Sequence, residues 1–295
     1  MRIRVLGSSA GGGLPQWNCG CERCVRARDG RLAPRCQPSI AVSADGARWS
    51  LVNASPDVHA QLAGFPPLHP RPGTRDLPLD SIVLTNADLD HTIGLLVLRE
   101  SLPYRVVATP WVRDVLLEHN AVFRLLAPAF GAAKLDEPVA LDRAGRLEAR
   151  LFPVPGKVPG WAAELAPNHP EATCGVRVTD LATGRRLVYV PGVRQLDSGT
   201  LAELSAAAVG FVDGTFFGED ELAGARAGAP DARAMGHVPV SGEAGSLVAL
   251  AALPGRVLYI HLNNTNPLVD PDSPEAGWVR AAGLEVAHDG LELEL

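Results

Sequence analysis

The chain lacks the features of several large classes of protein. Its 295 residues carry 27 basic and 33 acidic side chains, so it has no excess of positive charge with which to bind a nucleic-acid backbone. No stretch approaches the roughly 18 apolar residues of a membrane-spanning helix. The first residues lack the apolar segment and the small-residue cleavage site of a signal peptide. We therefore expect a cytoplasmic protein that neither spans a membrane nor binds nucleic acid.

Nucleotide-binding loops are also missing. Residues 3–7 form a predicted strand and are followed by a glycine-rich segment at residues 8–13. This segment has neither the lysine and hydroxyl residue of a phosphate-binding P-loop nor the glycine spacing of a dinucleotide-binding turn. The glycines therefore predict a tight turn with close backbone approach.

Cysteine is scarce, and its distribution does not suit a disulfide framework. Of five cysteines, Cys19, Cys21 and Cys24 fall within six positions. In a reducing compartment this crowding favours a metal, and three thiolates with one nitrogen ligand form a usual structural zinc site. Free thiols are the alternative. Cys36 and Cys174 have no such neighbours and are expected to be small buried side chains.

A second metal-competent cluster follows a predicted buried strand at residues 81–84. Asp88, Asp90 and His91 come directly after it, and an apolar stretch at residues 93–98 then predicts the start of a helix. Side chains at the carboxyl end of such a strand project into the crevice where ligands bind in layered α/β folds. The alternative is an ordinary turn in which Asp90 caps the helix.

Three further segments end in polar side chains. Asp213 ends a predicted strand and suits a pocket, although Asp-Gly is also ordinary turn chemistry. His237 lies in a loop, where it can bind or protonate a substrate or have a structural role. His261 ends the last buried strand, where a hydrogen-bonded core histidine is the alternative to a ligand. The asparagines that follow it can order the loop or bind polar substrate groups; they are Asn263, Asn264 and Asn266.

The order of predicted elements indicates an α/β (α+β) protein. Strands pair with helices in two successive halves, which predicts two mixed sheets between helices, a four-layer αββα sandwich. A hairpin is expected at residues 41–54, a helix beginning at Ser55 and Pro56, a helix at residues 110–120, a helix at residues 243–253 and one terminal strand at residues 285–295. We expect residues 1–295 to form a single domain.

The stretch around His91 resembles the metal motif of the metallo-β-lactamase superfamily. Members carry His-x-His-x-Asp-His at a strand-to-loop junction, and the aligned residues here are Asn86, Asp88, Asp90 and His91. The last two match. Two other ligand positions of that fold fall in this sequence on Pro155 and on residues 191–192. The ligands of a two-zinc hydrolase are therefore not all present.

Over nearly its whole length the chain resembles the pyrroloquinoline quinone (PQQ) biosynthesis protein B family. The motifs that carry this resemblance are residues 18–24, 53–57, 86–91, 155–159, 212–216, 235–242 and 260–267. The resemblance implies a metallo-β-lactamase fold and a role in making PQQ from a peptide with a cross-linked Glu and Tyr. It implies hydroxylation of the tyrosine ring of that precursor by non-haem iron and O₂, with other proteins of the pathway as candidate partners.

The resemblance also implies site roles. An Fe(II) oxygenase site needs about two histidines and one carboxylate, which His91 and His261 with Asp88 or Asp90 can supply. His237 is expected to orient the phenol or move its proton, and Asp213 to hold the substrate's amine. In a related phosphodiesterase branch a late histidine completes the three-cysteine zinc site. The matching residue here is Asn264, with His261 as the competing fourth ligand.

Two other functions compete with the iron-dependent hydroxylase. One is a carrier or accessory protein that helps move PQQ or its precursor toward the periplasm without chemistry. The other is a zinc hydrolase of the same fold, which the residues at Asn86, Pro155 and positions 191–192 disfavour.

Overall fold

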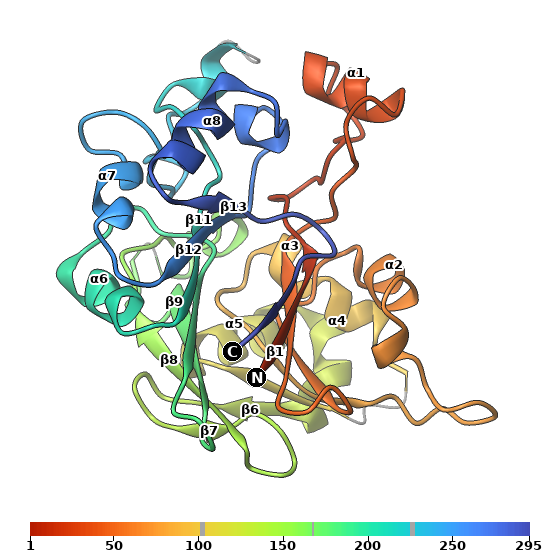
Figure 1. The fold of residues 1–295 in the computed structure, drawn as a ribbon. Helices are drawn as coiled ribbons and strands as arrows, with labels where there is room; N and C mark the ends of the chain where they lie inside the picture. Colours follow the sequence, from red (N-terminus) through yellow and green to blue (C-terminus); the bar gives the residue numbers. More distant parts are fainter. Residues whose placement is uncertain (101–103, 167, 225–227) are drawn as a thin grey trace.

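The computed structural model describes residues 1–100, 104–166, 168–224 and 228–295, which form two seven-stranded sheets lying face to face (Figure 1). The first sheet is antiparallel at one end and parallel across β3, β4, β5 and β6. Its strands, in spatial order, are β14 (Glu292–Glu294), β1 (Arg2–Gly7), β2 (Ser39–Ser43), β3 (Trp49–Val52), β4 (Leu79–Val83), β5 (Arg105–Ala108) and β6 (Phe130–Ala132).

The second sheet is built from the other half of the chain. It is parallel across β13, β12, β11 and β10 and antiparallel across β9, β8 and β7. Its strands, in spatial order, are β13 (Glu285–Val286), β12 (Arg256–Ile260), β11 (Val209–Asp213), β10 (Arg186–Val190), β9 (Cys174–Asp180), β8 (Leu147–Pro153) and β7 (Val139–Ala140).

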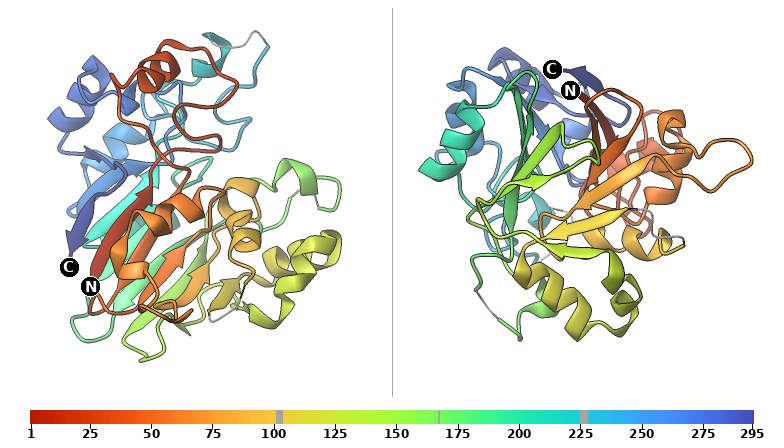
Figure 2. Two further views of the ribbon diagram at one scale, coloured as in Figure 1. Left: turned by 90° about the vertical axis from the view of Figure 1, so that its right-hand side faces the viewer. Right: turned by 90° about the horizontal axis from the view of Figure 1, so that it is seen from below.

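Helices cover the outer faces of both sheets, as the views in Figures 1 and 2 show. The α-helices on the side of the first sheet are α2 (Val58–Ala63), α3 (Leu89–Thr92), α4 (Gly94–Val97) and α5 (Pro110–His119). Those on the side of the second sheet are α6 (Ser198–Ser205), α7 (Ser246–Ala251) and α8 (Pro274–Ala281), whereas α1 (Glu22–Arg28) lies beyond the strand ends and shares an apolar core with them. The expected four-layer αββα sandwich of the metallo-β-lactamase fold is therefore confirmed.

Three apolar cores correspond to the three interfaces between these layers. The central core lies between the sheets and joins side chains such as Ile40 and Val83 to Leu151 and Phe211. A second core lies beneath α2, α4 and α5, and a third beneath α1, α6, α7 and α8. Because both faces of each inner strand are covered, these strands are mainly apolar, and the polar residues among them, such as Ser50, Asp80 and Ser81, are buried as well.

Several local predictions need correction. The helix predicted at Ser55 begins at Val58 and has Asp57 as its N-cap residue. The helix predicted at residues 243–253 is shorter, because Gly245 precedes α7 in extended conformation. The single strand predicted at residues 285–295 is two strands in different sheets, since the turn at Asp289 and Gly290 carries the chain from β13 to β14. The hairpin of β2 and β3 is confirmed.

The two sheets meet at the carboxyl ends of their parallel strands, where the polar residues lie. β4 leads into Asp88, Asp90 and His91, whereas β11 ends at Asp213 and β12 at Ile260. Isolated bridges, from Ser9 to Leu262 and from Asn86 to Thr173, tie the loops together at this edge. Across the part of the chain that the structure describes, no helix has both the length and the apolar character needed to cross a membrane.

Candidate metal centre

Five metal-competent side chains from both halves of the chain converge at this edge. Asp90, His91 and His261 form one group, and Asp213, His237 and His261 form another. Within each group the ligand atoms all lie within 4.8 Å of one another. His261 belongs to both groups, so it stands at the centre of the site.

The backbone at His261 is unusual for a residue with a side chain. Its φ is 63°, in the left-handed region that costs a non-glycine residue about 1 kcal/mol or more. Hydrogen bonds on either side hold it there: the amide of Gly214 donates to Ile260 O, and the amide of Leu262 donates to Ser8 O. The tight turn directs the imidazole back toward the loop that follows β4.

Asp90, His91 and His261 present three ligand atoms to one point. Nε2 of His261 lies 3.2 Å from Asp90 Oδ2, and Nε2 of His91 lies 3.8 Å from the same oxygen. The two rings meet edge to face with centroids 5.3 Å apart. Nε2 of His91 is fully buried and has no hydrogen-bond partner among the described residues. A buried polar atom without a partner is costly unless an ion or water occupies the space before it.

Two threonines hold the opposite ring nitrogens. Thr85 Oγ1 lies 3.1 Å from Nδ1 of His91, and Thr215 Oγ1 lies 2.8 Å from Nδ1 of His261. Because Thr215 donates its own proton to Asp213 Oδ1 at 2.6 Å, it accepts from the imidazole. Nδ1 of His261 therefore carries a proton, and Nε2, which faces Asp90 Oδ2 at 3.2 Å, is the atom left to bind a metal in place of a proton. A hydrogen bond of this kind is how proteins orient metal-binding histidines.

Asp213 and His237 form a buried carboxylate–imidazole pair. Asp213 Oδ2 lies 2.7 Å from Nδ1 of His237, and the amide of Val193 donates to the same oxygen. The ring of His237 stacks on that of His261 with centroids 5.5 Å apart. This pair therefore lies directly beside the first group, and its carboxylate is occupied by protein hydrogen bonds.

The charges of these groups follow from burial and from one another. Burial lowers the pKa of His91 to about 4, which keeps the ring neutral and able to bind a metal. Burial also opposes charge on His261, but the adjacent Asp90 carboxylate outweighs it and raises the pKa of that ring. Burial works against ionisation of Asp90 too, yet His91 and His261 hold its pKa well below the usual range.

Asp88 lies outside both groups of converging ligands. Its Oδ2 accepts a hydrogen bond from Asn86 Nδ2 at 2.9 Å, and its amide donates to Asn86 Oδ1. Of the two carboxylates predicted as metal ligands, the structure brings only Asp90 to the two histidines. Burial, and then the charge of Asp90, raise the pKa of Asp88 to about 6.

Replacing Asp88 by asparagine should stabilise the metal-free protein in a pH-dependent way. The folded protein holds this proton more tightly than the unfolded chain, so wild-type stability falls as pH rises from about 4 to about 6. The variant does not titrate there. Its advantage in unfolding free energy should be absent at pH 4 and reach about 3 kcal/mol at most by pH 8. Denaturant titrations at several pH values measure this difference in unfolding free energy, and Asp272→Asn, at an exposed aspartate, is the control. A difference that does not change with pH would refute the prediction.

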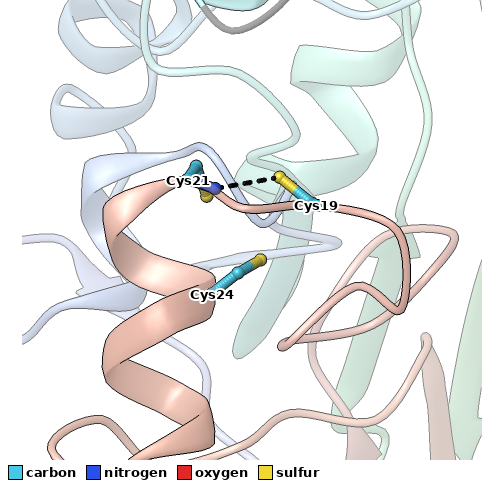
Figure 3. Close-up of side chains that lie close together, drawn as sticks. All are labelled: Cys19, Cys21 and Cys24. Carbon is cyan, nitrogen blue, oxygen red and sulfur yellow. Dashed lines mark hydrogen bonds between the residues drawn. The ribbon is translucent and has the colours of Figure 1, made fainter.

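The three clustered cysteines converge as predicted (Figure 3). Cys21 directly precedes α1 and Cys24 lies within it. The side-chain nitrogen of Asn264, Nδ2, lies 3.1 Å from Cys19 Sγ, 3.6 Å from Cys21 Sγ and 3.3 Å from Cys24 Sγ. Asn264 therefore occupies the fourth corner of the cluster. His261, the competing candidate, belongs to the other centre.

The three asparagines after His261 have different surroundings. Asn266 is fully buried and donates to Gly214 O and Thr215 O, which favours a structural role over the predicted contact with substrate. The contacts of Asn264 with the thiols likewise favour the cysteine cluster. Asn263 donates to Thr265 Oγ1 and lines a cavity of about 960 Å³ beside the cysteines. Its predicted contact with substrate stays a prediction.

The predicted ligand set did not include the two threonines or Asn53, which contacts Thr85, although Asn53 and Thr215 lie in motifs of the family resemblance. Each threonine follows a buried strand by two positions, at the same edge as the ligands. That position is the signal that could have found them.

The two-sheet fold and the ligand cluster between strand ends define a protein of the metallo-β-lactamase superfamily. The profile of the Beta-lactamase superfamily domain matches residues 48–262. Within that superfamily, the chain belongs to the PQQ synthesis protein B family. It is 44% identical to Coenzyme PQQ synthesis protein B of Methylobacterium radiotolerans and 46% identical to that of Ruegeria pomeroyi, each alignment spanning the whole of both chains.

Solved structures agree with this assignment. The crystal structure of Zn²⁺-bound PqqB from Methylobacterium extorquens matches with a TM-score of 0.94 and 41% identity over all of both chains. A diphosphatase of the PhnP family matches with a TM-score of 0.68 and 21% identity, over all of this chain and 97% of the other. The second likeness concerns the fold alone.

Proposed function

We propose that this protein hydroxylates the tyrosine ring of the cross-linked Glu–Tyr precursor of PQQ, using Fe(II), O₂ and an external two-electron reductant. One oxygen atom of O₂ enters the ring and the other leaves as water. The observation that carries this proposal is the group of two histidines and one carboxylate formed by His91, His261 and Asp90. That donor set, with coordination positions left open, is typical of non-haem Fe(II) oxygenases.

The donors fit such an ion. Nε2 of His91 is buried without a partner among the described residues, and Nε2 of His261 faces Asp90 while its Nδ1 is held by Thr215, so a metal can replace the proton at Nε2. A two-zinc hydrolase of this fold would need further ligands, but its positions hold Asn86, Pro155 and Pro191. Asn86 instead hydrogen-bonds Asp88. The remaining donor set thus favours one ion with space beside it.

The chain's own residues then have distinct tasks. Thr85 and Thr215 fix the imidazoles so that their Nε2 atoms face the ion. Fe(II) held there supplies the one-electron chemistry with which O₂ is activated. His237, held by Asp213 through Nδ1, directs Nε2 away from that carboxylate, where it can accept the phenol proton of the substrate. Because Asp213 is engaged by His237 and by Val193, we assign it to orienting His237 rather than to the predicted contact with the amine.

The cysteine cluster suits a structural ion. Three thiolates from Cys19, Cys21 and Cys24 form a zinc site of the closed kind when a fourth ligand completes the tetrahedron. The carboxamide of Asn264 can supply that ligand through its oxygen after rotation about its terminal bond. We propose that this site binds zinc and fixes α1 against the second sheet.

Loading the protein with Fe(II) without oxygen and then admitting O₂, with ascorbate present as the electron donor, should yield hydroxylated product from the cross-linked Glu–Tyr precursor. The His91→Ala variant should give at most a few per cent of the wild-type rate, since a metal ligand is lost. Mass spectrometry detects the hydroxylated product, and O₂ uptake gives the rate of wild type and variant. Absence of hydroxylated product, with wild type and variant alike, would refute the oxygenase proposal. Tight binding of PQQ or its precursor without O₂ uptake would favour the carrier.

A further inference from the structure

Lysine is rare in this chain, and one of its two lysines stands at the edge of the candidate metal centre. Lys134 and Lys157 are the only lysines among 27 basic side chains. Lys157 follows β8, in the loop of the sequence Pro-Gly-Lys-Val-Pro. The hydroxylation proposed above assigns no role to the residues of this loop.

The backbone of Lys157 is tied to the strand end that carries the metal ligands. Thr173 Oγ1 donates to Lys157 O at 2.8 Å, and Thr173 pairs with Asn86 in an isolated β-bridge. Gly156 lies so close to Thr173 that an added Cβ would stand 2.4 Å from the threonine Cβ. Lys157 is therefore held at a fixed distance from the loop of Asp88 and His91.

The side chain of Lys157 reaches the other half of the site. Its stem lies against Gly236, where an added Cβ would stand 2.7 Å from Lys157 Cδ. Gly236 has φ +88° and directly precedes His237. The lysine thus lies between the segment that carries Asp88 and the segment that carries His237. Its positive charge acts on the Asp88 carboxylate.

The ammonium group of Lys157 has no carboxylate partner within 4.0 Å among the residues that the structure describes. Lys134, by contrast, lies 3.7 Å from Glu137. Lys157 also lines a cavity of about 270 Å³ together with Asn168 and His169, which offer further polar atoms. A partly buried cation beside a polar cavity, with no ion pair in the protein, is suited to an anionic ligand.

We propose that Lys157 binds a carboxylate of the substrate and so places its ring beside His237 and the metal ligands. This inference rests on the proposed substrate, an amino-acid-derived phenol, but not on its hydroxylation. A flexible ammonium suits a carboxylate that must enter and leave, because it donates in several directions without the fixed geometry of a guanidinium.

The test is a binding measurement under anaerobic conditions, without turnover. The probes are the cross-linked Glu–Tyr compound and the same compound with its α-carboxylates converted to carboxamides. Wild type should bind the acid at least about tenfold more tightly than the amide. Lys157→Met should lose that preference while binding the amide within about twofold of wild type. Lys134→Met, the matched control, should behave as wild type.

Lys157→Gln, which keeps a polar end, provides a second variant, and circular dichroism with a thermal melt checks that each variant folds. Retained preference for the acid in both variants of Lys157 would overturn the inference. Equal loss of acid and amide binding, or no binding of either probe to wild type, would overturn it as well. Carboxylate-dependent binding without hydroxylation would contradict the proposed reaction alone and leave the role of Lys157 standing.

Discussion

Replacing His261 by asparagine should remove iron from the metal centre and abolish turnover. His261 is the one side chain common to both groups of candidate ligands, so no alternative triad survives its loss. Asparagine tolerates the backbone φ of 63° better than most residues, so the turn after β12 should be kept. Iron per chain should fall from near one to less than about a tenth, and turnover should drop by more than about a hundredfold.

Two further variants decide which triad holds the ion. If Asp90, His91 and His261 are the ligands, His91→Ala should lose iron. His237→Asn should keep iron but lose activity, because it removes the proton acceptor and not a ligand. Iron content measured after Fe(II) loading and desalting, with circular dichroism as the folding control, separates these outcomes. Iron retained in His91→Ala and lost in His237→Asn would assign the ion to Asp213, His237 and His261.

Much of the fold was predictable because it depends on local patterns. The β-branched strand at β4, the cap of α5 by Thr109 and the turn between β2 and β3 each follow from a few neighbouring residues. The terminal segment was not predictable in this way. Residues 285–295 form strands of two different sheets, and that crossing depends on Asp289, whose carboxylate accepts from the amides of Ser8 and Cys36.

The candidate site was predictable in residue type and less so in detail. Strand ends pointed to Asp90, His91, Asp213 and His261 because ligand-bearing residues collect where parallel strands end. Sequence spacing could not separate Asp88 from Asp90, since the hydrogen bond that Asp88 accepts from Asn86 is a property of the folded loop. The threonines that hold Nδ1 of each histidine come from positions that no ligand pattern marks.

The position of Asn264 has a consequence for both metal centres. It follows His261 by three residues, so one loop carries both a candidate ligand of the first centre and the residue that contacts the cysteine cluster. Asn266 anchors this loop to β11 through Gly214 and Thr215. Substitution of a cysteine should therefore lower the stability of this loop and of α1. The donors of the other centre should keep their positions, because the strands that carry them hold them in place.

Replacing Cys24 by serine should remove zinc and lower stability without removing iron. Cys24 is fully buried within α1 and lies in the core between that helix and the second sheet. Without a metal, burial and the neighbouring thiols raise the pKa of Cys24 to about 11, so zinc binding must release its proton. Because binding at a structural zinc site contributes directly to folding, the unfolding free energy should fall by several kcal/mol.

Elemental analysis and denaturant titration measure these two effects, with and without a zinc chelator. Wild type treated with chelator should approach the stability of Cys24→Ser, whereas the variant should not respond further. Cys36→Ser is the matched control, since Cys36 lies outside the cluster and its thiol, whose pKa burial raises to about 12, stays protonated. If the two centres are independent, Cys24→Ser should lose only zinc and His91→Ala only iron. Loss of both metals in either variant would mean that the two centres depend on one another.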